Sequence, residues 1–167
     1  QDLNISNTQI QELNPLIYSM SLRNLNLSYT KVSNLDPIAN LTKINVLNLS
    51  NTNIDAIDAI AAFTNLHDLR MQNTMVTDLE ILAGLSALSS LEIDNCSISI
   101  LESLSQVSEL RYLSCNNTLI RDLSPLKNLE KLSVLSLDNT EITSLKDLNN
   151  KDNLTKIYCD NTLLGKQ

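Results

Sequence analysis

Few side chains in this sequence have the types and spacing that catalysis or metal binding requires. There is one histidine, and there are three cysteines separated by 19 and 44 residues; these residues are His67, Cys96, Cys115 and Cys159. The cysteine spacings match no zinc or redox motif, and no glycine-rich phosphate loop or nucleophile elbow occurs. We therefore expect a protein that is not an enzyme and needs no cofactor or metal. We also expect His67 to lie exposed at a turn.

The charge and hydropathy of the chain exclude two further classes of function, nucleic-acid binding and membrane insertion. The formal net charge is -7 and the isoelectric point is near 4.6, whereas nucleic-acid binding rests on clustered Lys and Arg. We therefore expect no nucleic-acid partner. No apolar run approaches the roughly 18 residues of a membrane span, so we expect no membrane insertion by this chain. With one Phe and no Trp, the core must be aliphatic.

A repeat of 22 residues supplies the elements that must position any functional side chain. An aliphatic column recurs without insertion, and a second one lies two residues further on. Such an i, i+2 pair is typical of a strand with one buried face, so each repeat begins with a strand of about four residues. The first column consists of Leu3, Leu25, Leu47, Leu69, Leu91, Leu113, Leu135 and Ile157. The return leg of about 18 residues is long enough for a parallel crossover, so we expect one parallel sheet.

Small hydrogen-bonding residues form a ladder column after each strand. The column consists of Thr8, Thr30, Thr52, Thr74, Cys96, Thr118, Thr140 and Thr162. In a stack of coils these side chains point inward and can satisfy backbone groups of the turn. Apolar residues then recur at every third position, which favours short 3-10 and extended segments on the return leg. Pro15, Pro37 and Pro125 share one phase of that leg, where a backbone N–H is dispensable.

The strand and ladder columns of the third repeat form one continuous motif. It reads Ile44-x-x-Leu47-x-Leu49-x-x-Thr52-x-Ile54 and resembles the core signature of the leucine-rich repeat family. The repeat length and the Leu-x-Pro-Leu elements at 13–16 and 123–126 resemble the internalin-type bacterial subclass. One departure is that Thr stands at the ladder with Asn one residue earlier, where internalins more usually have Asn at the ladder itself.

The resemblance implies a fold and a domain organisation. The implied fold is an α/β leucine-rich repeat solenoid, with a curved parallel β-sheet of about eight short strands on the concave face. The convex face would carry 3-10 and extended segments. We expect one leucine-rich repeat domain over residues 1–167, with a coil starting at each residue of the first aliphatic column.

The two ends depart from the repeat. A column that is apolar in the middle of the chain reads Ser19 in the first coil and Lys151 in the last. Because terminal coils must hide an apolar face and a strand edge, we interpret the last coil as a polar close. The chain starts directly on a strand, so we expect a missing N-terminal neighbour and a longer protein.

The three thiols occupy positions of the repeat that point inward, and we expect them to be free, buried and inert.

The outward side chains of the sheet divide into three zones. The N-terminal zone is a field of amides and hydroxyls: Asn4, Asn26, Asn48, Ser6, Ser28 and Ser50. The middle zone is a charged block: Asp68, Arg70, Gln72, Glu92 and Asp94. The C-terminal zone combines Tyr112, Val134 and Tyr158 with a rim of Asn116, Asp138 and Asp160. Exposed tyrosine is enriched in binding sites, so we expect the ligand-binding residues to be Asp68, Arg70, Glu92, Asp94, Tyr112, Val134 and Tyr158.

These features favour a non-catalytic recognition module that binds a protein ligand on its concave sheet. The resemblance implies a secreted or cell-surface bacterial protein, and we expect this chain to be monomeric. One alternative is a structural or regulatory spacer beside a catalytic or anchoring domain outside this chain. A third reading is oligosaccharide binding, because Asn, Ser and Tyr are common sugar contacts.

Overall fold

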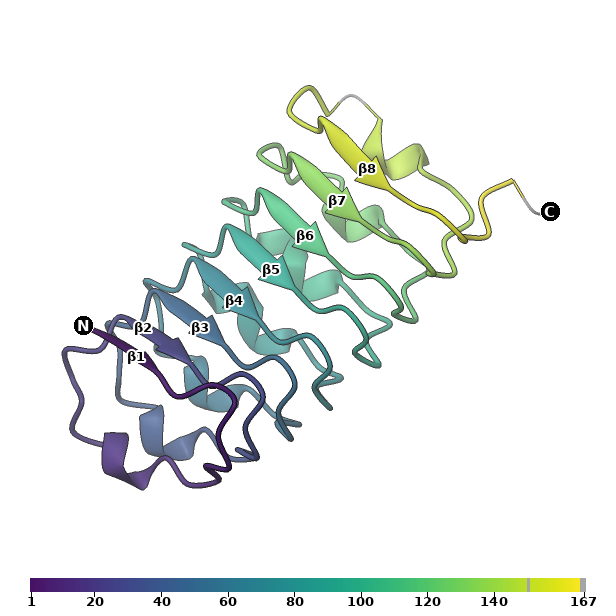
Figure 1. Ribbon diagram of the computed structural model, residues 1–167. Coiled ribbons are helices and arrows are strands. Elements are labelled where there is room, and N and C mark those ends of the chain that lie inside the picture. The colour runs from purple at the N-terminus through teal and green to yellow at the C-terminus, as the bar shows by residue number, and fades with distance from the viewer. Residues whose placement is uncertain (150, 166–167) are drawn as a thin grey trace.

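The structure is a computed structural model that describes residues 1–149 and 151–165. Within these residues, eight three-residue strands form one parallel sheet whose order follows the chain (Figure 1). The strands are β1 (Asp2–Asn4), β2 (Asn24–Asn26), β3 (Val46–Asn48), β4 (Asp68–Arg70), β5 (Ser90–Glu92), β6 (Tyr112–Ser114), β7 (Val134–Ser136) and β8 (Lys156–Tyr158). The predicted sheet is confirmed, with each strand one residue shorter than expected.

The register of the sheet is set by the constant repeat length. Leu25 on β2 pairs with Leu47 on β3, which pairs in turn with Leu69 on β4. Every strand therefore meets the next at the same phase, and each sequence column becomes a straight row across the sheet. Because side chains alternate along a strand, the middle residue points into the solenoid and its two neighbours point outward.

The return legs carry short 3-10 helices on the side opposite the sheet (Figure 1). They are η1 (Asn14–Leu16), η2 (Asp36–Ile38), η3 (Asp58–Ile60), η4 (Glu80–Gly84), η5 (Glu102–Gln106), η6 (Ser124–Leu126) and η7 (Lys146–Leu148). The three prolines occupy the second position of η1, η2 and η6. The first N–H groups of a helix have no partner within it, so proline is tolerated there as predicted. In the described part of the chain, no helix has the length and apolarity needed to cross a membrane.

The core lies between the sheet and the 3-10 helices and is aliphatic, as expected. In the third coil Ile54, Ile60, Phe63 and Leu66 are fully buried, and Ile57 is nearly so. The period of three therefore marks side chains that all point inward on the return leg. Burial of each such side chain contributes about 1.5–3 kcal/mol to folding, and the stack of coils makes this burial continuous along the chain.

The ladder column satisfies backbone carbonyls, which confirms that prediction. The Oγ1 atoms of Thr30 and Thr52 donate to the carbonyl oxygens of Leu27 and Leu49, three residues earlier, at 2.6 Å. The other threonines of the column make the same bond. The cysteine that replaces threonine in the fifth coil donates instead to the preceding coil.

The residue before the ladder takes a left-handed backbone conformation in every coil. It is asparagine in seven coils, with φ between 54° and 58°: Asn7, Asn51, Asn73, Asn95, Asn117, Asn139 and Asn161. Asparagine is one of the few residue types that adopt this conformation readily, because its short polar side chain can hydrogen-bond locally. The second coil has Tyr29 there instead, with φ of 56°. This conformation explains why Asn stands before the ladder, which the sequence alone shows only as a departure from the family pattern.

The expected polar close is present only in part in the last coil, where Lys151 makes polar contacts but Ile157 and Leu163 are each 38% exposed. The Nζ atom of Lys151 donates to the carbonyl oxygens of Lys127 at 3.1 Å and Leu129 at 2.9 Å. The ammonium group of Lys151 therefore lies against backbone carbonyls of the preceding coil. Desolvation by burial lowers the pKa of Lys151.

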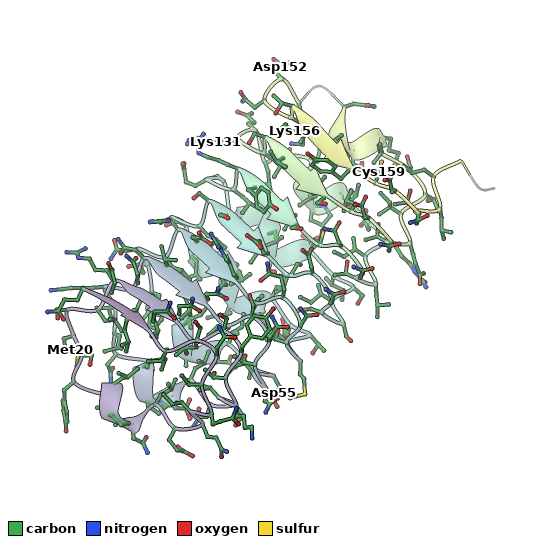
Figure 2. The ribbon with its side chains drawn as sticks, in the orientation of Figure 1. Met20, Asp55, Lys131, Asp152, Lys156 and Cys159 are labelled. Carbon is green, nitrogen blue, oxygen red and sulfur yellow. The ribbon has the colours of Figure 1, made fainter. Side chains whose placement is uncertain are left out.

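The prediction of three buried thiols is wrong for one of them. Cys96 and Cys115 are buried, whereas Cys159 is partly exposed at the C-terminal end of the array (Figure 2). Cys159 belongs to the last coil, and no further coil of the described chain covers its outer side. Burial raises the pKa of the Cys115 thiol well above its usual value, so that thiol stays protonated and unreactive.

Candidate ligand-binding face

The outward face of the sheet consists of two columns that run across all eight strands. The first outward column holds the first residue of each strand: Asp2, Asn24, Val46, Asp68, Ser90, Tyr112, Val134 and Lys156. The second outward column holds the third residue of each strand: Asn4, Asn26, Asn48, Arg70, Glu92, Ser114, Ser136 and Tyr158. The register brings together side chains that are 22 positions apart in sequence.

The charged block at the middle of the face is largely self-paired. The guanidinium of Arg70 donates to both carboxylate oxygens of Asp68, at 3.1 Å from Nε and 2.9 Å from Nη2. Nε of Arg70 also lies 3.5 Å from Oε1 of Glu92 on the next strand. The hydrogen bond to Asp68 is the main reason that the pKa of Arg70 is raised. Three of the predicted site residues therefore form one ion-pair cluster on β4 and β5.

Glu92 and Asp94 make further hydrogen bonds beside this cluster. Glu92 accepts a hydrogen bond from Nε2 of Gln72, and burial raises the pKa of Glu92 despite the opposing effect of Arg70. Oδ1 of Asp94 accepts from Oγ of Ser114 and from the backbone N–H of Asn116, both at 2.7 Å. Asp94 therefore braces the neighbouring coil, a role that no charge pattern in the sequence reveals.

The C-terminal zone places the predicted aromatic and aliphatic residues next to one another. Tyr112 and Val134 are direct partners on β6 and β7. Tyr158 on β8 pairs with Ser136, which puts it diagonal to Val134. Tyr112 and Val134 are partly buried, Tyr158 is 49% exposed, and desolvation raises the pKa of Tyr112. These three side chains, the C-terminal anchor, extend over three adjacent strands.

The rim of the C-terminal anchor is held by hydrogen bonds from coil to coil. Oδ1 of Asn116 accepts from the backbone N–H of Asp138, and Oδ1 of Asp138 accepts from the backbone N–H of Asp160, both at 2.7 Å. Hydrogen bonds to backbone N–H groups fix these side chains in place. The side chains of Asn116 and Asp138 are therefore held in place by contacts within the protein.

The N-terminal zone differs from the expected field of amides and hydroxyls. Ser28 and Ser50 are only 6% and 7% exposed, so the surface there is formed by the amides and not by these hydroxyls. Tyr29, which was not among the predicted site residues, is 58% exposed beside this zone. The signal that could have found it is the tyrosine in a column of asparagines.

The remaining chemical candidates are the histidine and possible metal ligands. His67 is exposed, as expected, and it lies directly before β4. Within residues 1–149 and 151–165, no group of three or more His, Cys, Asp or Glu could hold a metal ion.

The parallel sheet, the 3-10 return legs and the ladder define a leucine-rich repeat solenoid. A family model described as leucine-rich repeats in two copies matches residues 21–62 and 108–150. This chain belongs to the leucine-rich repeat family, and its repeats are of the internalin type. No curated protein sequence matches the chain.

The similar solved structures include bacterial proteins from two genera. Two internalins of Listeria monocytogenes are each 31% identical to this chain with a TM-score of 0.93. The alignment to one covers 96% of this chain and 48% of the internalin, and the alignment to the other covers 95% and 70%. A leucine-rich repeat protein of Leptospira interrogans shares the fold at 22% identity and a TM-score of 0.93, over 99% of this chain and 44% of its own. This chain thus spans about half the length of the first internalin.

Proposed function

We propose that this chain is a non-catalytic recognition module that binds a protein ligand on the outward face of its sheet. The observation that carries the proposal is the C-terminal anchor, in which Tyr112, Val134 and Tyr158 lie together on adjacent strands. Aromatic side chains dominate the binding energy of protein interfaces, and polar rims around them exclude water. The braced rim beside the anchor fits that arrangement.

The charged block supports specificity more than affinity in this proposal. Arg70 is paired with Asp68 and Glu92 before binding, so a ligand must complement a cluster whose charges are already partly neutralised. Such charges select partners and register, while apolar anchors supply most of the affinity. We also propose that the chain is a monomeric domain of a longer secreted or cell-surface bacterial protein, as its internalin relatives suggest.

The test is a double substitution that removes both aromatic anchors. Tyr112→Ala with Tyr158→Ala should leave the free energy of unfolding within about 1 kcal/mol of the parent, as surface changes usually do. The same variant should fail to retain the protein partner that the parent captures from host-cell extracts, identified by mass spectrometry. The matched control is Tyr18→Ala, at a tyrosine that is 89% exposed on the return leg.

The outcomes separate the proposal from its alternative. A folded double variant that captures the same partner as the parent places the ligand elsewhere. A parent that captures no protein supports the spacer role, in which the sheet face binds nothing. A double variant that unfolds readily makes the two tyrosines a structural cover for the end of the sheet.

A further inference from the structure

The asparagines at the N-terminal end of the second outward column form a row of oriented hydrogen-bond donors. Oδ1 of Asn4, Asn26 and Asn48 accepts the backbone N–H two residues further on, at 3.0 Å in each case. A backbone N–H can only donate, so this contact fixes which amide atom is oxygen and directs Nδ2 away from the turn. In the described part of the chain, no hydrogen bond within the protein uses these three Nδ2 groups.

The donor row borders one end of a trough that extends over the outward face from β1 to β5. A hollow of about 330 Å³ is bordered by the three asparagines, by Val46 and by Arg70. An adjoining hollow of about 370 Å³ shares Asn48 and Arg70. The trough therefore has an apolar patch at Val46 and a row of amide donors along its first hollow.

Tyr29 borders the second hollow of this trough. Its left-handed backbone conformation is unfavourable for a bulky residue, and the side chain is 58% exposed. An exposed aromatic ring beside a row of hydrogen-bond donors is a surface suited to a sugar ring, whose C–H faces pack on aromatics while its edges accept hydrogen bonds.

The spacing of the donor row distinguishes between possible ligands. The donors recur once per strand, about 4.8 Å apart, whereas an extended peptide presents carbonyl groups to one side only at every second residue, about 6.6 Å apart. The carbonyl groups of an extended peptide would therefore no longer align with the donors by the third asparagine. Each ring of an extended β-1,4-linked hexose chain advances by close to one strand spacing and offers oxygen acceptors at both edges.

The charges around the trough restrict the ligand further. The chain carries a net charge of -7, Asp2 borders the first hollow and Glu92 borders the second. The one cation of the trough, Arg70, is paired with Asp68 and Glu92. An anionic polysaccharide would therefore be repelled, and the trough fits an uncharged chain.

We propose that this trough binds an unbranched, uncharged β-1,4-linked oligosaccharide that lies across β1 to β4. Oxygen atoms of successive rings accept hydrogen bonds from Nδ2 of Asn4, Asn26 and Asn48, and one ring packs against Tyr29. The C-terminal anchor lies outside this site, and sugar binding does not require the proposed protein ligand. Arg70 and Glu92 of the charged block border the trough, so a protein that contacts the charged block would share this part of the surface with the sugar.

The experiment measures binding of three named hexasaccharides by isothermal titration calorimetry. The parent should bind chitohexaose or cellohexaose, which are β-1,4-linked, and should bind the α-linked maltohexaose at least tenfold more weakly. The key variant is Asn26→Asp with Asn48→Asp. Each new carboxylate still accepts the N–H of Ser28 or Ser50, so the turns are kept while both outward donors are lost. This variant should bind the β-linked hexasaccharide at least tenfold more weakly than the parent.

A matched control carries the same two substitutions away from the trough. Asn40→Asp with Asn128→Asp adds the same negative charge at exposed positions just after η2 and η6, and it should bind like the parent. Three results would overturn the proposal. They are a parent that binds neither β-linked sugar, a trough variant with parental affinity, and an equal loss in the control. Tight binding of an uncharged peptide in place of all three sugars would assign the trough to a peptide ligand instead.

Discussion

Tyr29 and Asn51 take the same left-handed backbone conformation at equivalent positions of adjacent coils, with φ of 56° and 58°. In both coils the backbone N–H of this residue donates to the next coil, from Tyr29 to the carbonyl of Ser50 at 2.9 Å and from Asn51 to that of Gln72 at 2.8 Å. The stack of coils therefore imposes the conformation whatever the side chain. For most residues other than glycine, asparagine and aspartate, the left-handed conformation costs about 1–2 kcal/mol.

Replacing this tyrosine with the residue of the other seven coils should stabilise the protein. We expect Tyr29→Asn to raise the free energy of unfolding by about 1 kcal/mol, because asparagine adopts positive φ with less strain. Urea unfolding followed by circular dichroism measures the change. The control Tyr18→Asn alters an exposed tyrosine outside the left-handed positions and should leave the urea midpoint unchanged. A midpoint for Tyr29→Asn at or below that of the parent would contradict this account of the strain.

The ladder should be more sensitive to mutation at Thr52 than at Thr74. The carbonyl of Leu49 accepts the hydroxyl of Thr52 at 2.6 Å, whereas the carbonyl of Met71 accepts both the hydroxyl of Thr74 at 2.8 Å and Sγ of Cys96 at 3.1 Å. Thr52→Val leaves a buried carbonyl without its side-chain donor and should lower the free energy of unfolding by about 1–3 kcal/mol. Thr74→Val should lower it less, because Cys96 remains as a donor.

Adding a second substitution tests that explanation of the ladder. Thr74→Val with Cys96→Ala removes both donors to the Met71 carbonyl and should lose more than the sum of the two single losses. Urea midpoints of the four proteins in this cycle give the comparison. Strict additivity would mean that the two donors do not share the Met71 carbonyl in solution.

The solenoid fold could be predicted because every coil repeats the same pattern of buried and exposed positions. Leu47 and Leu69 lie in register because 22 residues separate them, and the same arithmetic places every core column. The repeat fails as a guide where neighbours differ, which is why Cys159 in the last coil is partly exposed while Cys115 is buried. The burial of a side chain in a terminal coil depends on whether another coil covers it. The position of a residue within the repeat does not reveal this.

The candidate site was less predictable, because its geometry depends on side chains from different coils. The sequence places Asp94 beside Glu92 as one more exposed charge, yet Asp94 braces Ser114 and the N–H of Asn116. In the first coils the equivalent support comes from within the coil, as from Asn26 to the N–H of Ser28. Whether the backbone N–H is bound from within its own coil or from the preceding coil depends on which side chain of each coil can accept a hydrogen bond. A search for recurring columns does not detect this difference.

The partial exposure of Cys159 should make it the first thiol to react. In native protein we expect a maleimide reagent to modify Cys159 readily, while Cys96 and Cys115 stay unmodified until denaturant is added, because both are buried and inaccessible to the reagent. Peptide mass spectrometry locates the label. Cys159→Ser should leave the native protein almost unlabelled, and fast native labelling of Cys115 would be incompatible with the stacked coils.

Glu92 should make the protein less stable as the pH rises above the acidic range. Burial raises the pKa of Glu92 above its ordinary value of 4.5, so the folded state holds this proton more tightly than the unfolded state does. The contribution of protonated Glu92 to the free energy of unfolding is therefore fully present below pH 4.5, and it is lost as the pH rises through the folded-state pKa. Glu92→Gln cannot ionise, so the stability of this variant relative to the parent should increase between pH 4 and pH 7.

Glu109 provides the matched control, because its pKa is shifted in the opposite direction. The hydrogen bond from Lys131 lowers the pKa of Glu109, so ionisation of Glu109 favours the folded state and this contribution is lost as the pH falls through the folded-state pKa. The stability of Glu109→Gln relative to the parent should therefore decrease between pH 4 and pH 7. Urea unfolding of the three proteins at a series of pH values measures both trends. A decrease for both variants would mean that the Arg70 ion pair, and not burial, controls the ionisation of Glu92, whereas an increase for both would contradict the effect assigned to Lys131.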